Sequence, residues 1–251
     1  FGMSMNDSRS NTLAIAFTDE VGFLAELPSK APDGYIVNID SDPSTNTDDR
    51  WVKFTARDDI DPDTDIGEGS WAECTAPGIT FKLNDNTLPY HVKREGLNTL
   101  FIGPADGEVR TVGDVEYEFP EWGIRSTGTE KTCPNPDIVD KVIRDHAFFR
   151  ERYVLVGGET VQFSEVGDAY NYFQDSVLLL TDQDAFAAKC VSEVSSSLEW
   201  VLPIDENLLA WSSTSQFQIR SADSSPLNAT SVVSVRPVSY THLRAHETPR
   251  H

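Results

Sequence analysis

The densest set of residues that could do chemistry is Asp59–Asp65, where an aspartate stands at every second position. Carboxylate oxygens at such a spacing can hold calcium. An EF-hand loop beginning at Asp61 fails, because Ile66 stands where the turn needs glycine and Ala72 where the bidentate glutamate belongs. Two interpretations stay open, a calcium loop of another type and a solvated acidic loop.

The histidines are the next candidates, as metal ligands or as catalytic bases. His242 and His246 stand four residues apart, a spacing that suits two ligands on one helix, but no third ligand is near them. His91 falls within a predicted strand and His146 begins an apolar run. These two share no ligand spacing, so we expect packed or surface side chains and assign no metal site.

No sequence motif for catalysis or for nucleotide binding is present. The cysteines Cys74, Cys133 and Cys190 are odd in number, far apart and in no C-x-x-C pair, which favours free thiols. Gly157-Gly158 separates two predicted strands and precedes no helix, so it reads as a hairpin turn and not as a phosphate loop. Carboxylates are plentiful, but nothing selects one glycosidase-type pair. We therefore predict a protein that is not an enzyme, with no catalytic residue, metal or cofactor.

The tryptophans could line a sugar-binding groove or pack inside the protein. All of them lie within or beside predicted strands, which favours packing. They are Trp51, Trp71, Trp122, Trp200 and Trp211.

Composition describes a globular chain with a strongly acidic surface. The 251 residues carry a net charge of −21 and are 39% hydrophobic, which is enough for a sizeable core. A surface this acidic repels phosphate, so binding of DNA or RNA by the chain alone is not expected. The sequence has no apolar run of about 18 residues, so we predict no transmembrane helix and no membrane partner.

Short runs rich in β-branched and aromatic residues predict a mainly β fold of antiparallel sheets with a few short helices. Two stretches, His146–Ser164 and Leu198–Ile219, look like the same strand–turn–strand unit. Their turns lie about 55 residues apart, a period typical of propeller blades. The other expected strands are Leu13–Phe17, Val21–Leu24, Tyr35–Ile39, Trp51–Thr55, Gly69–Thr75, Thr80–Leu83, His91–Arg94, Leu97–Ile102 and Gly113–Phe119.

The faces of the repeated units predict how they are covered. Tyr153–Val156 and Leu208–Trp211 are apolar on both faces, so each needs cover on both sides. Val161 and Phe163 alternate with polar residues, as on a half-exposed strand. We also expect a short helix over Ile138–Asp145, after an irregular crossing at 121–136. Segments 176–180 and 185–191 could be strand or helix.

The chain divides into four parts by these patterns. Residues 1–24 read as the end of a truncated preceding β region, 25–130 as a β-rich module with acidic loops and 131–236 as a propeller-like β module. Residues 237–251 hold three of the five histidines, including His251, and show neither strand nor helix periodicity. We interpret that last part as a non-native, adapter-derived tail on a metagenomic fragment, outside the fold.

A set of motifs in one order resembles the tail tubular protein B, or tail nozzle, family of short-tailed bacteriophages. It begins with Leu27-Pro28 and Ala31–Val37 and continues with a tryptophan strand and Leu88–Arg94. It then runs through Asp145–Arg152, Gly157–Ser164, Asp168–Phe173 and Leu208–Ile219. The resemblance covers nearly everything from Phe1 to about Val235, and Asp182–Phe186 departs from the family pattern.

The resemblance implies a structural virion protein located in the tail and assembled in the host bacterial cytoplasm. Its copies would form a ring, a hexamer, that continues the DNA channel and takes part in DNA retention and ejection. It also implies contacts with the tail adaptor, tubular protein A, and with the tail fibres, and viral DNA that passes without specific binding. The alternative is a β-propeller phage tail protein that binds or cleaves carbohydrate, and a calcium-dependent binding module is a third hypothesis.

Overall fold

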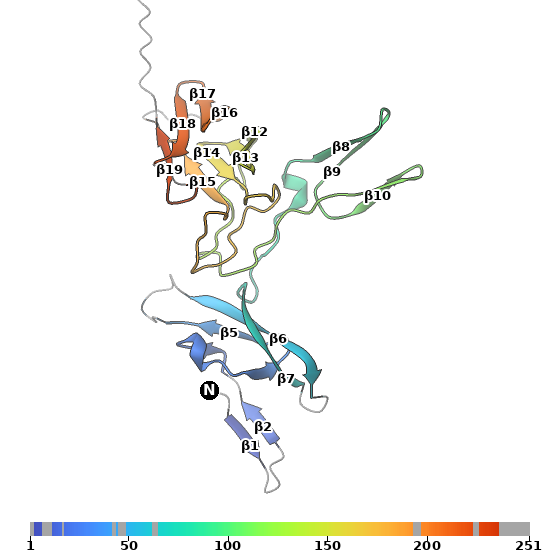
Figure 1. The fold of residues 1–251 in the computed structure, drawn as a ribbon, viewed down its shortest axis with the longest axis vertical. Coiled ribbons are helices and arrows are strands. Elements are labelled where there is room, and N and C mark those ends of the chain that lie inside the picture. Colours follow the sequence, from blue (N-terminus) through green and yellow to red (C-terminus); the bar gives the residue numbers. More distant parts are fainter. Residues whose placement is uncertain are drawn as a thin grey trace, which may run out of the picture.

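The computed structural model describes residues 3–6, 12–16, 18–41, 44, 49–61, 65–192, 197–222 and 226–235. Within them the regular secondary structure is mainly β, as predicted, and the helices are two short 3-10 turns, η1 (Leu24–Glu26) and η2 (Asp85–Thr87). No helix among these residues has the length and apolar character needed to cross a bilayer. The sheets form a lower part, two projecting hairpins and an upper part (Figure 1).

The lower part is a five-stranded sheet with the order β3-β5-β6-β7-β4 (Figure 1). Only β3 and β5 run parallel. Val52 and Phe54 share the buried face of β6, while Lys53 and Thr55 are exposed. The strands are β3 (Glu20–Val21), β4 (Lys30–Pro32), β5 (Ile36–Ile39), β6 (Arg50–Ile60) and β7 (Ile66–Cys74). A separate pair, β1 (Met3–Asn6) and β2 (Thr12–Ala16), precedes the sheet.

Two predicted strands before residue 90 are wrong in whole or in part. Only Glu20–Val21 of the first region is a strand, since Leu24 already lies in η1. Thr80–Leu83 forms no strand, because its carbonyls are engaged by one arginine: the Nη1 of Arg125 donates to Thr80 O and its backbone N to Phe81 O (2.6 Å). A ladder partner would compete for these acceptors.

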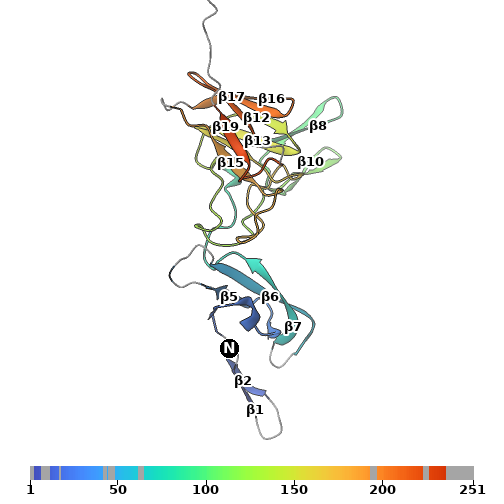
Figure 2. The ribbon, with the colours of Figure 1, turned by 60° about the vertical axis from the view of Figure 1, so that its left-hand side comes forward.

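Two hairpins project from the molecule in both views (Figures 1 and 2). The first is β8 (His91–Glu95) with β9 (Thr99–Gly103), and the second is β10 (Val109–Val112) with β11 (Val115–Glu118). Gly113 adopts a φ of 64° in the turn of the second hairpin, a conformation that favours glycine.

The upper part consists of two four-stranded antiparallel sheets, each with its strands in sequence order. The first is β12 (Ile143–Phe149), β13 (Arg152–Gly157), β14 (Thr160–Phe163) and β15 (Phe186–Lys189). The second is β16 (Leu198–Ile204), β17 (Asn207–Ser212), β18 (Gln216–Ser221) and β19 (Val232–Val235). The two predicted repeat units are therefore the first three strands of equivalent sheets, which curl into a half-barrel. Closure into a propeller stays a prediction.

One apolar core joins these two sheets. Val154, Val156 and Phe163 of the first sheet meet Leu208 and Ile219 of the second, and all five are 0% exposed. The described cysteines form no disulfide, so the apolar surface that these two sheets bury against each other is the main contribution to their stability.

Two predictions in the upper part are wrong. Ile138–Asp145 forms turns and the start of β12, because Asp140 adopts a φ of 63°, which a helix does not allow. The polar positions of β14 are also buried: Thr160 and Gln162 are each 2% exposed. Each has a local partner, since the Nζ of Lys141 donates to Thr160 Oγ1 (2.7 Å) and Gln162 Nε2 donates to Phe186 O (3.1 Å), while Gln162 Oε1 is buried without a hydrogen-bond partner. Of the two undecided segments, 185–191 contains β15 and 176–180 is neither strand nor helix.

Glu73, near the end of β7, links the lower sheet to the upper part. Its carboxylate accepts hydrogen bonds from Thr127 Oγ1 (2.8 Å), Ser176 Oγ (3.0 Å) and the backbone N of Val177 (3.0 Å). The backbones are also linked next to this side chain, since Thr75 and Gly128 form a parallel bridge. The link is polar and small, and Glu73 supplies the carboxylate that accepts all three of these side-chain and backbone donors.

We expect Glu73→Ala to lower the free energy of unfolding by about 1–2 kcal/mol, since three donors lose their acceptor. The substitution should also make the chain near the Thr75–Gly128 bridge easier to cleave, which limited proteolysis would measure. Glu68→Ala on the same strand is the matched control, because its exposed ion pair with Lys30 (3.1 Å) should contribute less than about 1 kcal/mol. Equal behaviour of the two variants would contradict the link.

Candidate functional site

The two hairpins meet the upper part at an aromatic cluster centred on His91. The ring nitrogens of His91 are both engaged: Nδ1 lies 2.6 Å from the hydroxyl of Tyr170, and Nε2 lies 2.8 Å from the hydroxyl of Tyr117. His91 belongs to β8, Tyr117 to β11 and Tyr170 to the loop after β14. One side chain therefore bridges three elements that are distant in sequence.

Rings surround the histidine and fix the angle between the hairpins. Tyr117 stacks on His91 at 5.8 Å, and Phe119 meets the edges of both His91 and Tyr117. Phe101 of β9, only 3% exposed, lies 5.4 Å from the ring of Tyr117. An isolated two-stranded hairpin is only marginally stable, so this cluster holds both hairpins in place.

Burial of His91 lowers its pKa, and the nearby ammonium of Lys93 lowers it further. The neutral ring then donates to one tyrosine and accepts from the other. Neutral phenols fit this arrangement, since burial raises the pKa of Tyr170. With both nitrogens engaged, His91 connects β8, β11 and the loop after β14, and it has no free nitrogen to act as a base.

We expect low pH to destabilise the contact between the two hairpins and the upper part, because acid protonates His91. We call this contact, made by His91, Tyr117 and Tyr170, the hairpin joint. Its folded-state pKa lies below the unfolded value, so the unfolded chain takes up the proton first as the pH falls. This contribution to stability is complete above about pH 6.5 and is lost as the pH falls toward the folded pKa. Urea unfolding of wild type and His91→Phe at neutral pH and at about pH 5 should show a smaller acid loss in the variant. An identical acid loss in both proteins would argue against this role.

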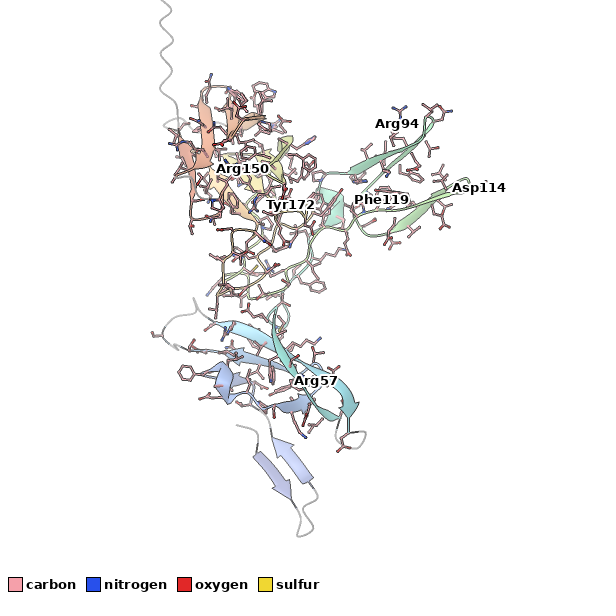
Figure 3. All side chains as sticks on the ribbon, viewed as in Figure 1. Arg57, Arg94, Asp114, Phe119, Arg150 and Tyr172 are labelled. Atoms are coloured by element: carbon pink, nitrogen blue, oxygen red, sulfur yellow. The ribbon has the colours of Figure 1, made fainter. Side chains whose placement is uncertain are left out.

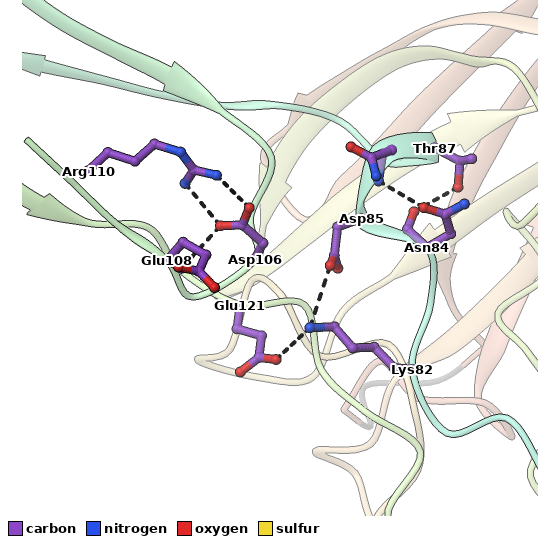
Figure 4. Close-up of polar contacts among 9 residues, drawn as sticks. Lys82, Asn84, Asp85, Thr87, Asp106, Glu108, Arg110 and Glu121 are labelled. Carbon is purple, nitrogen blue, oxygen red and sulfur yellow. Dashed lines mark hydrogen bonds and ion pairs between the residues drawn. The ribbon is translucent and has the colours of Figure 1, made fainter.

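Ion pairs at the base of the hairpins support the same joint (Figure 4). Arg110 donates to both carboxylate oxygens of Asp106, from Nη1 (2.9 Å) and Nη2 (2.5 Å), and its guanidinium lies over the ring of Phe119 at 4.4 Å. These hydrogen bonds lower the pKa of Asp106 to about 2. Nearby, Lys82 lies between Glu121 (2.8 Å) and Asp85 (3.5 Å). The pairs are only partly buried and open to solvent, so each contributes little to stability and mainly fixes the orientation of the chain at the base of the hairpins.

A cleft of about 340 Å³ opens between the β8–β9 hairpin and β12. Its lining is largely aromatic and includes Tyr90, His91, Trp122, His146, Phe148, Tyr153 and Tyr170. The structure thus brings together His91 and His146, which the sequence pattern did not connect. Among the described residues, no group of three His, Cys, Asp or Glu could hold a metal ion.

The other candidate residues lie apart from this cleft or outside the described residues. Asp65 adopts a φ of 57° and donates its N–H to Asp61 O (2.8 Å) in the β6–β7 connection, but residues 62–64 are not described, so the calcium loop stays a prediction. His242, His246 and His251 also lie outside the described residues.

The cysteines are free thiols, with Cys74 half-buried and Cys133 and Cys190 buried. Burial raises the pKa of Cys190 to about 11, so this thiol is unreactive at neutral pH.

The tryptophans do not gather into one groove. Trp71 packs on Tyr35 and Phe54 and donates to Pro28 O (2.9 Å), as the packing interpretation predicts. Trp122 is 2% exposed against Tyr170 and Tyr172. Trp200, however, is 56% exposed on β16, so packing within this chain does not account for it.

Comparison with known proteins places these features in context. The family model described as "Bacteriophage nozzle protein" matches residues 1–248. The tail tubular protein gp12 of Escherichia phage T7 is 26% identical over 211 residues. That alignment takes in 84% of this chain and 23% of the relative, so the chain spans less than a quarter of the relative's length.

Proposed function

The chain belongs to the bacteriophage nozzle protein family, and from this membership we propose that it forms part of the tail channel through which viral DNA is retained and then ejected. The observation that carries the proposal is the family match over residues 1–248. The protein is a structural component of the tail, and the match does not favour the carbohydrate-binding or carbohydrate-cleaving alternative.

The charge of the chain supports the channel role. A conduit must let DNA pass, and each lysine or arginine that contacts phosphate strengthens binding by releasing counterions. A net charge of −21 repels phosphate overall, which supports passage of DNA without specific binding. The engagement of both His91 nitrogens by tyrosines supports a role without catalysis.

We further propose that copies of the protein form a hexameric ring in the virion tail. The ring contacts the adaptor, tubular protein A, on one side and the tail fibres around it, and it is assembled in the cytoplasm of the host bacterium. The division near residues 24, 130 and 236 is part of the same proposal, with the lower sheet and the upper sheets as separate modules.

The test uses purified phage particles that carry this coding sequence. Mass spectrometry should find its peptides in the particles, and gold-labelled antibody against the chain should mark the tail in electron micrographs. Purified chain should not bind duplex DNA at physiological salt. Tight binding of DNA, or absence of the peptides from intact particles, would contradict the proposal.

A further inference from the structure

The outer face of the β8–β9 hairpin is apolar and exposed. Val92 lies opposite Ile102 on this face, and Arg94 lies opposite Leu100. The three apolar side chains are 57%, 58% and 52% exposed for Val92, Ile102 and Leu100. An apolar surface of this kind on a rigidly held hairpin is typical of a protein interface.

The inner face of the same hairpin shows what kind of partner it accepts. There Phe101 is covered by Tyr117 of the β10–β11 hairpin (5.4 Å). The two hairpins are similar in length, with strands of five and four residues. Within one chain, then, a β10–β11 hairpin already stacks on one side of a β8–β9 hairpin. The opposite side has no such cover among the described residues.

The outer face of β10–β11 complements the outer face of β8–β9. It carries Val109 opposite Glu118 and Thr111 opposite Glu116, with Val109 56% exposed. Segment 108–118 holds four acids, and its one base, Arg110, is paired with Asp106. Figure 3 shows Arg94 and Asp114 toward the free ends of the two hairpins. In the strand registers, Arg94 on one outer face and Glu116 on the other each lie one residue pair before the pair that closes the turn.

We propose that the β10–β11 hairpin of a second copy stacks its outer face on the outer face of β8–β9. Val109 of that copy packs on Val92 and Ile102, and its Glu116 pairs with Arg94. The inference rests on the proposed function for the assumption that copies assemble. It adds the surfaces by which they meet.

The aromatic cleft offers the β10–β11 hairpin of the second copy a further contact surface, on β12. Val92 lines this cleft together with His146 and Phe148 of β12, and Phe148 is 69% exposed. Arg144 lies on the same exposed face of β12. Each of the two elements beside the cleft thus carries an arginine, Arg94 on β8 and Arg144 on β12, so an acidic hairpin matches this region by charge as well as by apolar surface.

The geometry of this contact determines the kind of assembly. Two different faces meet, so each copy offers one face to the neighbour before it and the other to the neighbour after it. Such a head-to-tail contact closes into a ring when its rotation closes, and a ring then contains alternating hairpins stacked all around.

Charge exchange in the chain of 251 residues tests the interface, with assembly measured by sedimentation velocity over a range of concentrations. Arg94→Glu and Glu116→Arg should each weaken association by about tenfold or more, and the double variant should recover to within about threefold of wild type. Glu130→Arg makes the same charge change at an exposed site away from the hairpins and should have no effect. Ile102→Glu should abolish association without lowering the thermal stability of the monomer, since Ile102 is already exposed.

The failures of the two proposals are distinguishable. If the chain assembles but neither charge variant weakens assembly, this interface is wrong while the tail role stands. If the purified chain stays monomeric at the highest soluble concentration, the interface is overturned, and the particle labelling still decides the tail role. Recovery in the double variant, together with disulfide formation only when Ile102→Cys and Val109→Cys proteins are mixed, confirms the stacking.

Discussion

Replacing Arg152 with methionine should lower the free energy of unfolding by about 3–5 kcal/mol. Arg152 is 2% exposed, and its guanidinium donates to four backbone carbonyls. Nη1 donates to Ser164 O (2.5 Å), Asp184 O (2.9 Å) and Gln183 O (3.2 Å), and Nη2 donates to Asp182 O (2.5 Å). Methionine has a similar volume but removes this donor from all four acceptors. Gln183 O keeps its hydrogen bond from Val166 N (3.0 Å), and each buried acceptor that is left unpaired is costly.

The same side chain attaches the loop before β15 to the sheet. Burial lowers the pKa of Arg152, and the carboxylates of Asp184, Glu165 and Asp182 oppose that effect, so the guanidinium stays charged. Urea unfolding followed by tryptophan fluorescence measures the change. Arg144→Met, on the exposed face of β12, is the matched control and should shift stability by less than about 0.5 kcal/mol. Similar losses in both variants would contradict the role of Arg152.

Phe163→Ala should also cost about 3–5 kcal/mol, because it opens a cavity where the two upper sheets meet. Phe163 is 0% exposed and stacks on Phe186 at 4.5 Å. The core around it includes Leu208 and Ile219 of the second sheet. The loss should therefore reach both sheets, and amide exchange should speed up in β17 and β18 as well as in β14.

Phe148→Ala is the control for this variant. Both substitutions remove the same ring, but Phe148 is 69% exposed, so its loss should cost less than about 1 kcal/mol. Faster exchange confined to β12–β15 in Phe163→Ala would mean that the two sheets are not one cooperative unit.

The sequence predicts the upper sheets well where local signals agree. Gly157-Gly158 forms the expected turn, with Gly158 at a φ of 59°, and the turn of the second repeat unit falls at Ser212–Ser215, where Ser212 N donates to Ser215 O (2.9 Å). The turn at Arg150-Glu151 carries no such signal. Its two residues adopt φ values of 49° and 60°, which usually favour asparagine or glycine, so only the neighbouring strands impose it.

Tertiary contacts explain what the sequence could not show. Gln162 looks like a surface residue by alternation, yet it lies on an inner strand covered on both faces. Segment 80–83 has strand composition, but Arg125 occupies its carbonyls. His91 meets Tyr117 and Tyr170, which are 26 and 79 residues away, so no local spacing could reveal the joint. The ordered family motifs, in contrast, predicted the family without any of these contacts.

A cryo-electron microscopy reconstruction of the tail of the phage that carries this sequence tests the central claim most directly. We expect a ring of copies in the tail, each with two four-stranded sheets curled into a half-barrel and joined to a pair of hairpins, around a channel in which no lysine or arginine of this chain contacts DNA phosphates. A tail whose ring is built from another protein, with this chain absent from the map and from the particle, would contradict it.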